Sequence, residues 1–209
     1  GVPPAEPVAV PVNPEDVWPA RHLIIGFDGV RLSEETKSLI QRYQPGGVWL
    51  RESNVTGPGQ LAALIQEIYA LYRGAAALDM RPLLFFAPES GLSSNALQVS
   101  KPLAYSEVAA LNDPNAIKKA GYDMATATIQ AGIDVLLSPP LDVCDPESAD
   151  ASAKRLVFGD NAETVARVGL AYAEGMMEAG AIVVGKHYPG AGTAIMQGDG
   201  ILLLAETDV

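Results

Sequence analysis

Short apolar runs alternate with longer segments of helical periodicity along most of this 209-residue chain. A short continuous apolar run is typical of a strand buried on both faces, and apolar residues spaced by three and four are typical of a helix that packs on one side. Alternating strands and helices predict an α/β protein built on a parallel sheet, because each parallel pair of strands needs a crossover connection. The predicted strands are residues 23–27, 46–50, 82–86, 133–137, 181–185 and 201–204.

Local signals mark where the helices between these strands begin. Ser33 precedes two glutamates, so we expect it to cap a helix whose first turn carries carboxylates. Asp113 is followed by a proline at the first helical position, and Asp160 or Asn161 caps a later helix. The helices that these residues cap run over about 114–130 and 162–179, and a further helix is predicted over about 60–72.

Two architectures fit the alternation, a doubly wound open sheet and a (β/α)8-type barrel. A nucleotide-binding turn is absent from the pattern: Gly190–Ala191–Gly192 lacks the third glycine, and no convincing helix follows it. Residues 180–186 have the glycine and lysine spacing of a phosphate loop, but His187 stands where Ser or Thr is required. There is also no Gly-x-Ser-x-Gly motif of a serine hydrolase.

The composition excludes several classes of partner and cofactor. Fourteen Lys and Arg against 25 Asp and Glu give a net charge of −11, which disfavours nucleic acid and anionic lipid as partners. Cys144 is the single cysteine, and His22 and His187 are the only histidines, so we predict no metal centre and no cofactor. No apolar run approaches the roughly 20 residues of a membrane-spanning helix.

The first 20 residues differ from the rest of the chain. They are rich in proline and lack apolar periodicity, so we expect a proline-rich leader at 1–20 before a folded domain at 21–209. A tether that remains after removal of a secretory or lipoprotein signal fits this composition, as does a disordered chain end. We therefore expect the cell envelope or periplasm, with the cytoplasm as the alternative.

Functional residues of parallel α/β folds lie at the carboxyl ends of the strands. Lys186 and His187 leave the fifth predicted strand together, Asp142 follows the fourth, and Arg51 follows the second. Charged groups at the end of a buried strand point to a ligand, because packing alone seldom explains them. Two alternatives stay open: a structural ion pair of Lys186 with Asp142 or Glu89, and a Schiff-base role for this lysine.

Four segments, in chain order, resemble motifs of the family 3 glycoside hydrolases, nearest the bacterial β-N-acetylhexosaminidases that act on peptidoglycan fragments. They are Gly46–Arg51 with Asn54, Ala131–Val143, Arg155 with Phe158–Asp160, and Lys186–Gly192. The resemblance implies a (β/α)8-like barrel that hydrolyses O-glycosyl bonds. It further implies an amino-sugar pocket whose substrate-binding residues are Lys186, His187, Asp142, Arg155 and Arg51.

The chain departs from the family pattern where the family places its chemistry. Pro88 stands in place of the sugar-binding aspartate and Ser93 in place of the arginine. Residues 197–199 replace the Asp-Ser-His that carries the general acid/base, and the nucleophilic aspartate lies beyond Val209 or is absent. Since glycoside hydrolysis needs two such groups, we expect impaired catalysis. The alternative is a non-catalytic pseudoenzyme of the cell envelope that binds a glycan or another partner.

The predicted barrel is incomplete or reduced, with about six strands where a closed one has eight. Only residues 191–200 separate the fifth and sixth predicted strands, which is too short for a crossover helix. The outer strands of an unclosed barrel have apolar edges that can pair with another chain. We therefore expect either a homodimer or a missing C-terminal half.

Overall fold

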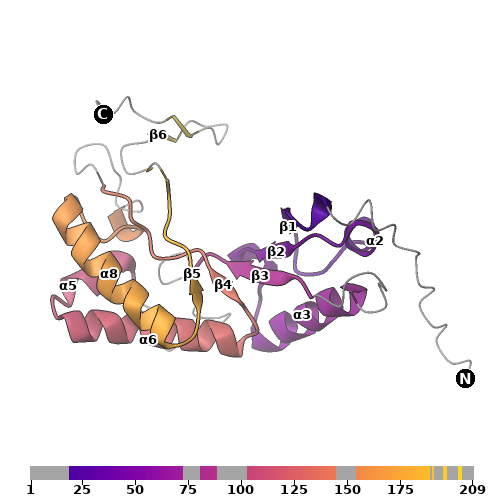
Figure 1. Cartoon of the computed structure of the whole chain (residues 1–209), viewed down its shortest axis with the longest axis horizontal. Helices are drawn as coiled ribbons and strands as arrows, with labels where there is room; N and C mark the ends of the chain where they lie inside the picture. The colour runs from indigo at the N-terminus through magenta and orange to yellow at the C-terminus, as the bar shows by residue number, and fades with distance from the viewer. Residues whose placement is uncertain are drawn as a thin grey trace, which may run out of the picture.

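A five-stranded parallel sheet with helices between its strands forms the body of the protein (Figure 1). The computed structural model describes residues 19–72, 81–88, 103–144, 154–188, 190, 195–196 and 202–203. The strands are β1 (Ile24–Gly26), β2 (Gly47–Leu50), β3 (Leu83–Phe86), β4 (Val135–Leu136) and β5 (Ile182–Val183). The helices are α2 (Glu34–Tyr43), the 3-10 helix η1 (Glu52–Asn54), α3 (Pro58–Tyr72), α5 (Tyr105–Ala110), α6 (Pro114–Gln130) and α8 (Ala162–Glu178). The predicted α/β class is confirmed. The predicted leader lies almost wholly outside the described residues.

The strand order identifies the architecture as barrel-like. Each strand pairs in parallel with the next strand along the chain, from β1 to β5. A doubly wound sheet would instead reverse its order at a switch point, where its ligands bind. Within the described residues β1 and β5 have one neighbour each, so the sheet does not close. The expected incomplete (β/α)8-like barrel is confirmed.

The sixth predicted strand does not join this sheet. Within residues 201–204, Leu202–Leu203 form β7, which pairs antiparallel with β6 (Ile195–Met196). An antiparallel pair needs no crossover helix, unlike a further parallel strand. Among the described residues, β6 and β7 form a separate two-stranded sheet, and the parallel sheet has five strands rather than six.

Three predicted helix caps are present. The Ser33 side chain accepts a hydrogen bond from the Thr36 N–H at 3.1 Å, and Asp113 accepts one from the Asn115 N–H at 3.0 Å. Of the two candidates before α8, Asn161 is the cap, because its side chain accepts from the Thr164 N–H at 2.9 Å. None of the described helices is long and apolar enough to span a membrane.

The two faces of the sheet have opposite environments. On one face the strand residues are almost completely buried and pack with apolar residues of the helices: Val48, Leu50, Leu84, Phe86 and Leu136. The apolar stripes of the helices, which include Ile68, Ile117 and Met176, complete this core. On the other face several large apolar side chains are exposed, among them Ile24 and Ile182, each 53% exposed. The prediction that the strands are buried on both faces holds for Val135, which shares this second face and is 2% exposed, but it is wrong for Ile24 and Ile182.

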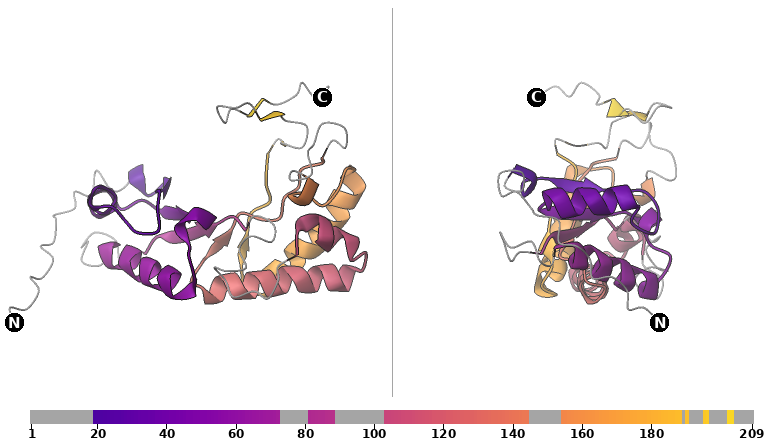
Figure 2. Two further views of the ribbon diagram at one scale, coloured as in Figure 1. Left: turned by 180° about the vertical axis from the view of Figure 1, so that it is seen from behind. Right: turned by 90° about the vertical axis from the view of Figure 1, so that its right-hand side faces the viewer.

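Helices α6 and α8 pack against each other more closely than ordinary side chains allow (Figure 2). At their contact, Gly121 faces the backbone of Tyr172, and Gly175 faces the backbone of Lys118. A methyl group at either glycine would collide with a backbone carbonyl oxygen of the facing helix. The paired glycines therefore let the two backbones approach.

We expect Gly121→Ala to destabilise the domain by about 1–3 kcal/mol, because an added methyl group must push the two helices apart. Gly59→Ala is the matched control, since Gly59 lies in α3 with open space around it. That substitution should be neutral or stabilising by up to ~1 kcal/mol, from helix propensity alone. Urea unfolding of both variants measures the difference, and equal stabilities would contradict the close packing.

An ion pair joins β3, β4 and α3 at the amino end of the sheet. The Arg81 guanidinium donates to both carboxylate oxygens of Asp134, each at 2.7 Å. The same carboxylate accepts from the Leu84 N–H at 2.9 Å, and Arg81 also donates to the Tyr69 hydroxyl at 2.9 Å. Hydrogen bonding to Asp134 raises the pKa of Arg81, and partial burial raises the pKa of Tyr69.

We expect Asp134→Ala to cost about 2–4 kcal/mol of unfolding free energy, because it breaks a bidentate pair and leaves the Leu84 N–H without its acceptor. Asp123→Ala removes a carboxylate from an exposed pair with Lys119 on α6 and should change stability by less than ~1 kcal/mol. Thermal and urea unfolding of the two variants provide the comparison. A similar loss in both would mean that the Asp134 pair is an ordinary surface contact.

Candidate functional site

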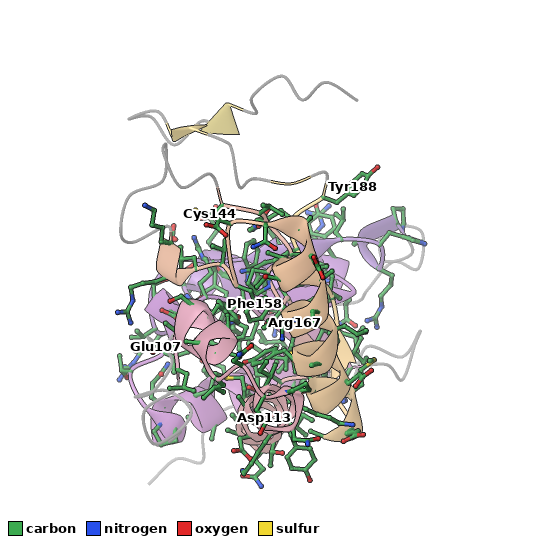
Figure 3. The ribbon with its side chains drawn as sticks, turned by 90° about the vertical axis from the view of Figure 1, so that its left-hand side faces the viewer. Glu107, Asp113, Cys144, Phe158, Arg167 and Tyr188 are labelled. Atoms are coloured by element: carbon green, nitrogen blue, oxygen red, sulfur yellow. The ribbon has the colours of Figure 1, made fainter. Side chains whose placement is uncertain are left out.

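The polar residues that follow the strands gather on one side of the molecule. Figure 3 shows Cys144, which lies just after the β4 segment, and Tyr188, which lies just after the β5 segment, on this side. Parallel strands end at the same edge of a sheet, so the segments after β1, β2, β4 and β5 must all emerge there. This carboxyl edge is where the sequence predicts the functional site.

His187 and Asp142 form a direct pair at this edge. The His187 Nδ1 and Asp142 Oδ2 atoms are 2.7 Å apart. Asp142 is only 5% exposed, whereas the His187 side chain is 57% exposed. An ionised carboxylate can only accept hydrogen bonds, so His187 Nδ1 must carry a proton and a neutral ring then has Nε2 as its acceptor. The pair thus presents an oriented, solvent-accessible imidazole.

Backbone hydrogen bonds beyond the strands create this pairing. The Lys186 N–H donates to the Pro139 carbonyl at 3.0 Å, and the Leu141 N–H donates to the Lys186 carbonyl at 2.5 Å. An isolated parallel bridge between Pro140 and Lys186 thus follows the β4–β5 pairing. Asp142 lies two residues after Pro140, and His187 lies one residue after Lys186. Lys186 itself is half-buried.

Arg51 belongs to a second cluster, at the ends of β1 and β2. Its guanidinium donates to the Phe27 carbonyl and to Asp28 Oδ1, both at 2.7 Å. Neighbouring strands lie ~4.8 Å apart, so the three strand spacings between β2 and β5 separate Arg51 from His187 by roughly 14 Å. The structure therefore does not bring Arg51 into contact with the His187–Asp142 pair.

Asn54 organises this second cluster from a fully buried position. Its amide nitrogen donates to the carbonyl groups of Phe27 at 3.0 Å and Gly29 at 2.6 Å. Its amide oxygen accepts from the Arg51 N–H at 2.8 Å. Three loop positions are thus held by one side chain. In the sequence, Asn54 is notable only as part of a motif that resembles the family. Its structural role depends on contacts with the distant residues Phe27 and Gly29.

Arg155 is exposed in the segment that precedes α8. Two neighbours of this arginine, Val157 and Phe158, are buried and line a cavity of about 330 Å³ that Cys144 also lines. The Cys144 N–H donates to the Gly159 carbonyl at 3.1 Å, which ties this segment to the chain that follows β4. Arg155 itself does not line this cavity.

A buried hydroxyl pair lies beneath the carboxyl edge and was not predicted. The Tyr105 hydroxyl donates to the Pro88 carbonyl at 2.6 Å and lies 2.9 Å from Ser138 Oγ. Pro88 occupies the position at which the resemblance places a sugar-binding aspartate, and here its carbonyl group accepts a structural hydrogen bond. The tyrosine ring also packs edge-on against Phe158, with ring centroids 5.3 Å apart. A serine directly after an apolar strand was the only sequence signal for this contact.

Comparison with known proteins identifies the family. Residues 17–204 match the Glycosyl hydrolase family 3 N terminal domain. A beta-hexosaminidase of Alkalilimnicola ehrlichii is 31% identical over 184 residues, which are 82% of this chain and 49% of that protein. A secreted glycosyl hydrolase of Arthroderma benhamiae is 26% identical over 179 residues, 85% of this chain and 50% of that protein. The chain belongs to glycosyl hydrolase family 3, through the N-terminal domain of that family.

A solved structure agrees with this assignment. The crystal structure of NagZ from Neisseria gonorrhoeae in complex with N-trifluoroacetyl-D-glucosamine has a TM-score of 0.71 and 26% identity. The match covers 88% of this chain and 53% of NagZ. The chain thus spans about half the length of the relatives that it matches.

The Asn54 cluster yields a prediction about loop stability. Asn54→Asp keeps an oxygen for the Arg51 N–H but removes both donors and places a buried carboxylate beside two carbonyl groups. We expect a loss of about 2–4 kcal/mol in urea unfolding, because a buried charge without donors is costly. Asn115→Asp, at the exposed start of α6, is the control and should be close to neutral. A small effect of the Asn54 substitution would contradict the organising role.

Proposed function

We propose that this domain binds the terminal amino sugar of a glycan at the carboxyl ends of β4 and β5, and that it is catalytically impaired as a glycosidase. The observation that carries the proposal is the His187–Asp142 pair at 2.7 Å, at an edge where the family has its substrate site by resemblance. Lys186 precedes His187 in this pair, and Arg155 lies in the segment before α8.

Sugar recognition suits the chemistry of these side chains. A sugar offers vicinal hydroxyl groups, each of which can donate and accept. The His187 Nε2 atom can accept from one hydroxyl, and the Lys186 ammonium group can donate to a neighbouring one. Because Asp142 fixes the ring, little rotational freedom is lost when the sugar binds. Arg155 and Arg51 complete the proposed set as residues at the border of the site.

Two carboxylates at this edge support the proposal of impaired catalysis. Retaining hydrolysis needs a nucleophile and a proton donor ~5–5.5 Å apart, both able to reach the glycosidic bond. Asp142 is buried and occupied by His187, and Asp28 is paired with Arg51 at the far side of the sheet. The departures at Pro88, Ser93 and residues 197–199 support the same conclusion from the sequence.

The alternative is a pseudoenzyme whose partner is another molecule of the cell envelope. The proline-rich composition of residues 1–20 supports an envelope or periplasmic location, and one relative is named as secreted. In this alternative the carboxyl edge has lost its affinity for sugars, so direct titration separates the two proposals.

We expect N-acetylglucosamine or a muropeptide fragment to bind in isothermal titration calorimetry, with no turnover of p-nitrophenyl N-acetyl-glucosaminide in the same sample. His187→Ala should weaken binding by about tenfold or more, which corresponds to the loss of ~1.4 kcal/mol of hydrogen bonding. His22→Ala is the matched control, because this histidine precedes β1 at the opposite end of the sheet. Turnover that His187→Ala abolishes would contradict impaired catalysis, and the absence of binding would favour the alternative partner.

A further inference from the structure

The hydroxyl group of Tyr105 lies where the backbone pairing of β3 and β4 stops. Among the described residues, the last backbone hydrogen bond between these two segments runs from the Leu137 N–H to the Phe86 carbonyl at 2.8 Å. Pro88 and Pro139 follow, and neither proline has an N–H with which to continue the pairing. The Tyr105 hydroxyl supplies a donor instead, because it lies 2.6 Å from the Pro88 carbonyl oxygen.

The strand register shows that this contact ties the two segments at matching positions. Phe86 is paired with Leu136 at the ends of the two strands. Pro88 and Ser138 each stand two residues further along. The Ser138 Oγ atom lies 2.9 Å from the oxygen of Tyr105. A tyrosine hydroxyl has one proton, which goes to the carbonyl group because a carbonyl can only accept, so the Ser138 hydroxyl donates to Tyr105.

Tyr105 is itself fixed by α5 and by aromatic packing. It is the first residue of α5, and the Glu107 carboxylate accepts from the Ala104 N–H at 2.7 Å at the start of this helix. The tyrosine ring packs edge-on against Phe158 and Tyr172, with ring centroids 5.3 and 5.9 Å away. Because Tyr105 is only 3% exposed, the ring has little room to move, and its hydroxyl group is a fixed point in the fold.

One of the segments that Tyr105 holds leads directly to the candidate site. The stretch Ser138–Asp142 begins at the serine that donates to the tyrosine. Within this stretch the Pro139 carbonyl accepts from the Lys186 N–H at 3.0 Å. At its end the carboxylate of Asp142 pairs with His187. A continuous set of hydrogen bonds therefore connects the buried tyrosine with the exposed imidazole.

We propose that Tyr105 is a positioning residue of the sugar site. Its hydroxyl group fixes the stretch Ser138–Asp142, so that the carboxylate at the end of this stretch holds His187 with Nε2 free to accept from a sugar hydroxyl. Tyr105 acts through Ser138 and does not touch the sugar. The role in sugar binding rests on the proposed function. The fixed orientation of His187 does not, because it can be measured with no sugar present.

Tyr105→Phe tests the role, because it keeps the ring and removes only the hydroxyl group. Tyr72→Phe is the matched control: the Tyr72 hydroxyl also donates from a buried position to a proline carbonyl, that of Pro45 at 2.8 Å, but it does so before β2, at the amino end of the sheet. Both variants should lose about 2–4 °C of melting temperature, since each loses one buried hydrogen bond.

Only one of these two variants should change the affinity for sugar. In isothermal titration calorimetry with N-acetylglucosamine, Tyr105→Phe should bind about three- to tenfold more weakly than the unmodified chain, because the imidazole is no longer held in place. Tyr72→Phe should bind as the unmodified chain does. Equal affinities of the two variants would overturn the positioning role.

The tautomer of His187 gives a readout that needs no sugar and that a loss of stability alone does not change. Two-bond proton–nitrogen correlation spectra distinguish a proton on Nδ1 from one on Nε2, and His22, the only other histidine, is the internal reference. At mildly alkaline pH, where imidazoles are neutral, the unmodified chain should show the Nδ1–H form of His187. Tyr105→Phe should add the Nε2–H form, and Tyr72→Phe should not. An unchanged tautomer in Tyr105→Phe would overturn the proposal.

Ser138→Ala removes the second hydroxyl group of the same contact. It should also produce a mixture of tautomers, and the double variant with Tyr105→Phe should change the tautomer no more than the larger single effect, because both substitutions break one connection. Circular dichroism spectra establish that each variant folds. Additive effects would mean two independent contacts and would overturn the proposal. If the unmodified chain binds no sugar, the proposed function fails, while the tautomer measurements still decide the role of Tyr105.

Discussion

The burial of apolar side chains between the helices and a single face of the parallel sheet holds the rest of this structure in place. Val48, Leu84 and Leu136, from three adjacent strands, are almost fully buried against α3, α6 and α8. Because all five strands run in the same direction on this core, their carboxyl ends meet along one edge. The polar residues after each strand lie at this edge because the strands end there, and no direct attraction between those residues is needed.

Within that edge, backbone pairing decides which side chains meet. An isolated bridge joins Pro140 to Lys186 beyond β4 and β5, and Asp142 and His187, two residues and one residue further on, lie within hydrogen-bond distance. Arg51 emerges from the same edge but three strands away, where Asn54 and the β1 loop hold it.

The family assignment and the candidate site concern the same edge of the sheet. The chain belongs to glycosyl hydrolase family 3 and spans about half the length of the relatives that it matches. The His187–Asp142 pair lies at the carboxyl edge, where the sequence predicts the site, and sugar binding by this pair is the function that we propose.

The sequence by itself determined the order of strands and helices, their parallel pairing, the caps at Ser33 and Asp113, and the family. These features depend on short-range periodicity and on residue types at fixed spacing, which are visible in a linear chain. Only the tertiary structure decided that Asp142 pairs with His187, that Asn54 holds the β1 loop, and that Asp134 binds Arg81. It also decided that residues 202–203 pair antiparallel with residues 195–196, and that Ile24 and Ile182 are exposed on the sheet face opposite the helices. Each of these contacts joins residues far apart in the chain, and strand register and sheet curvature, which set such distances, leave no local trace in the sequence.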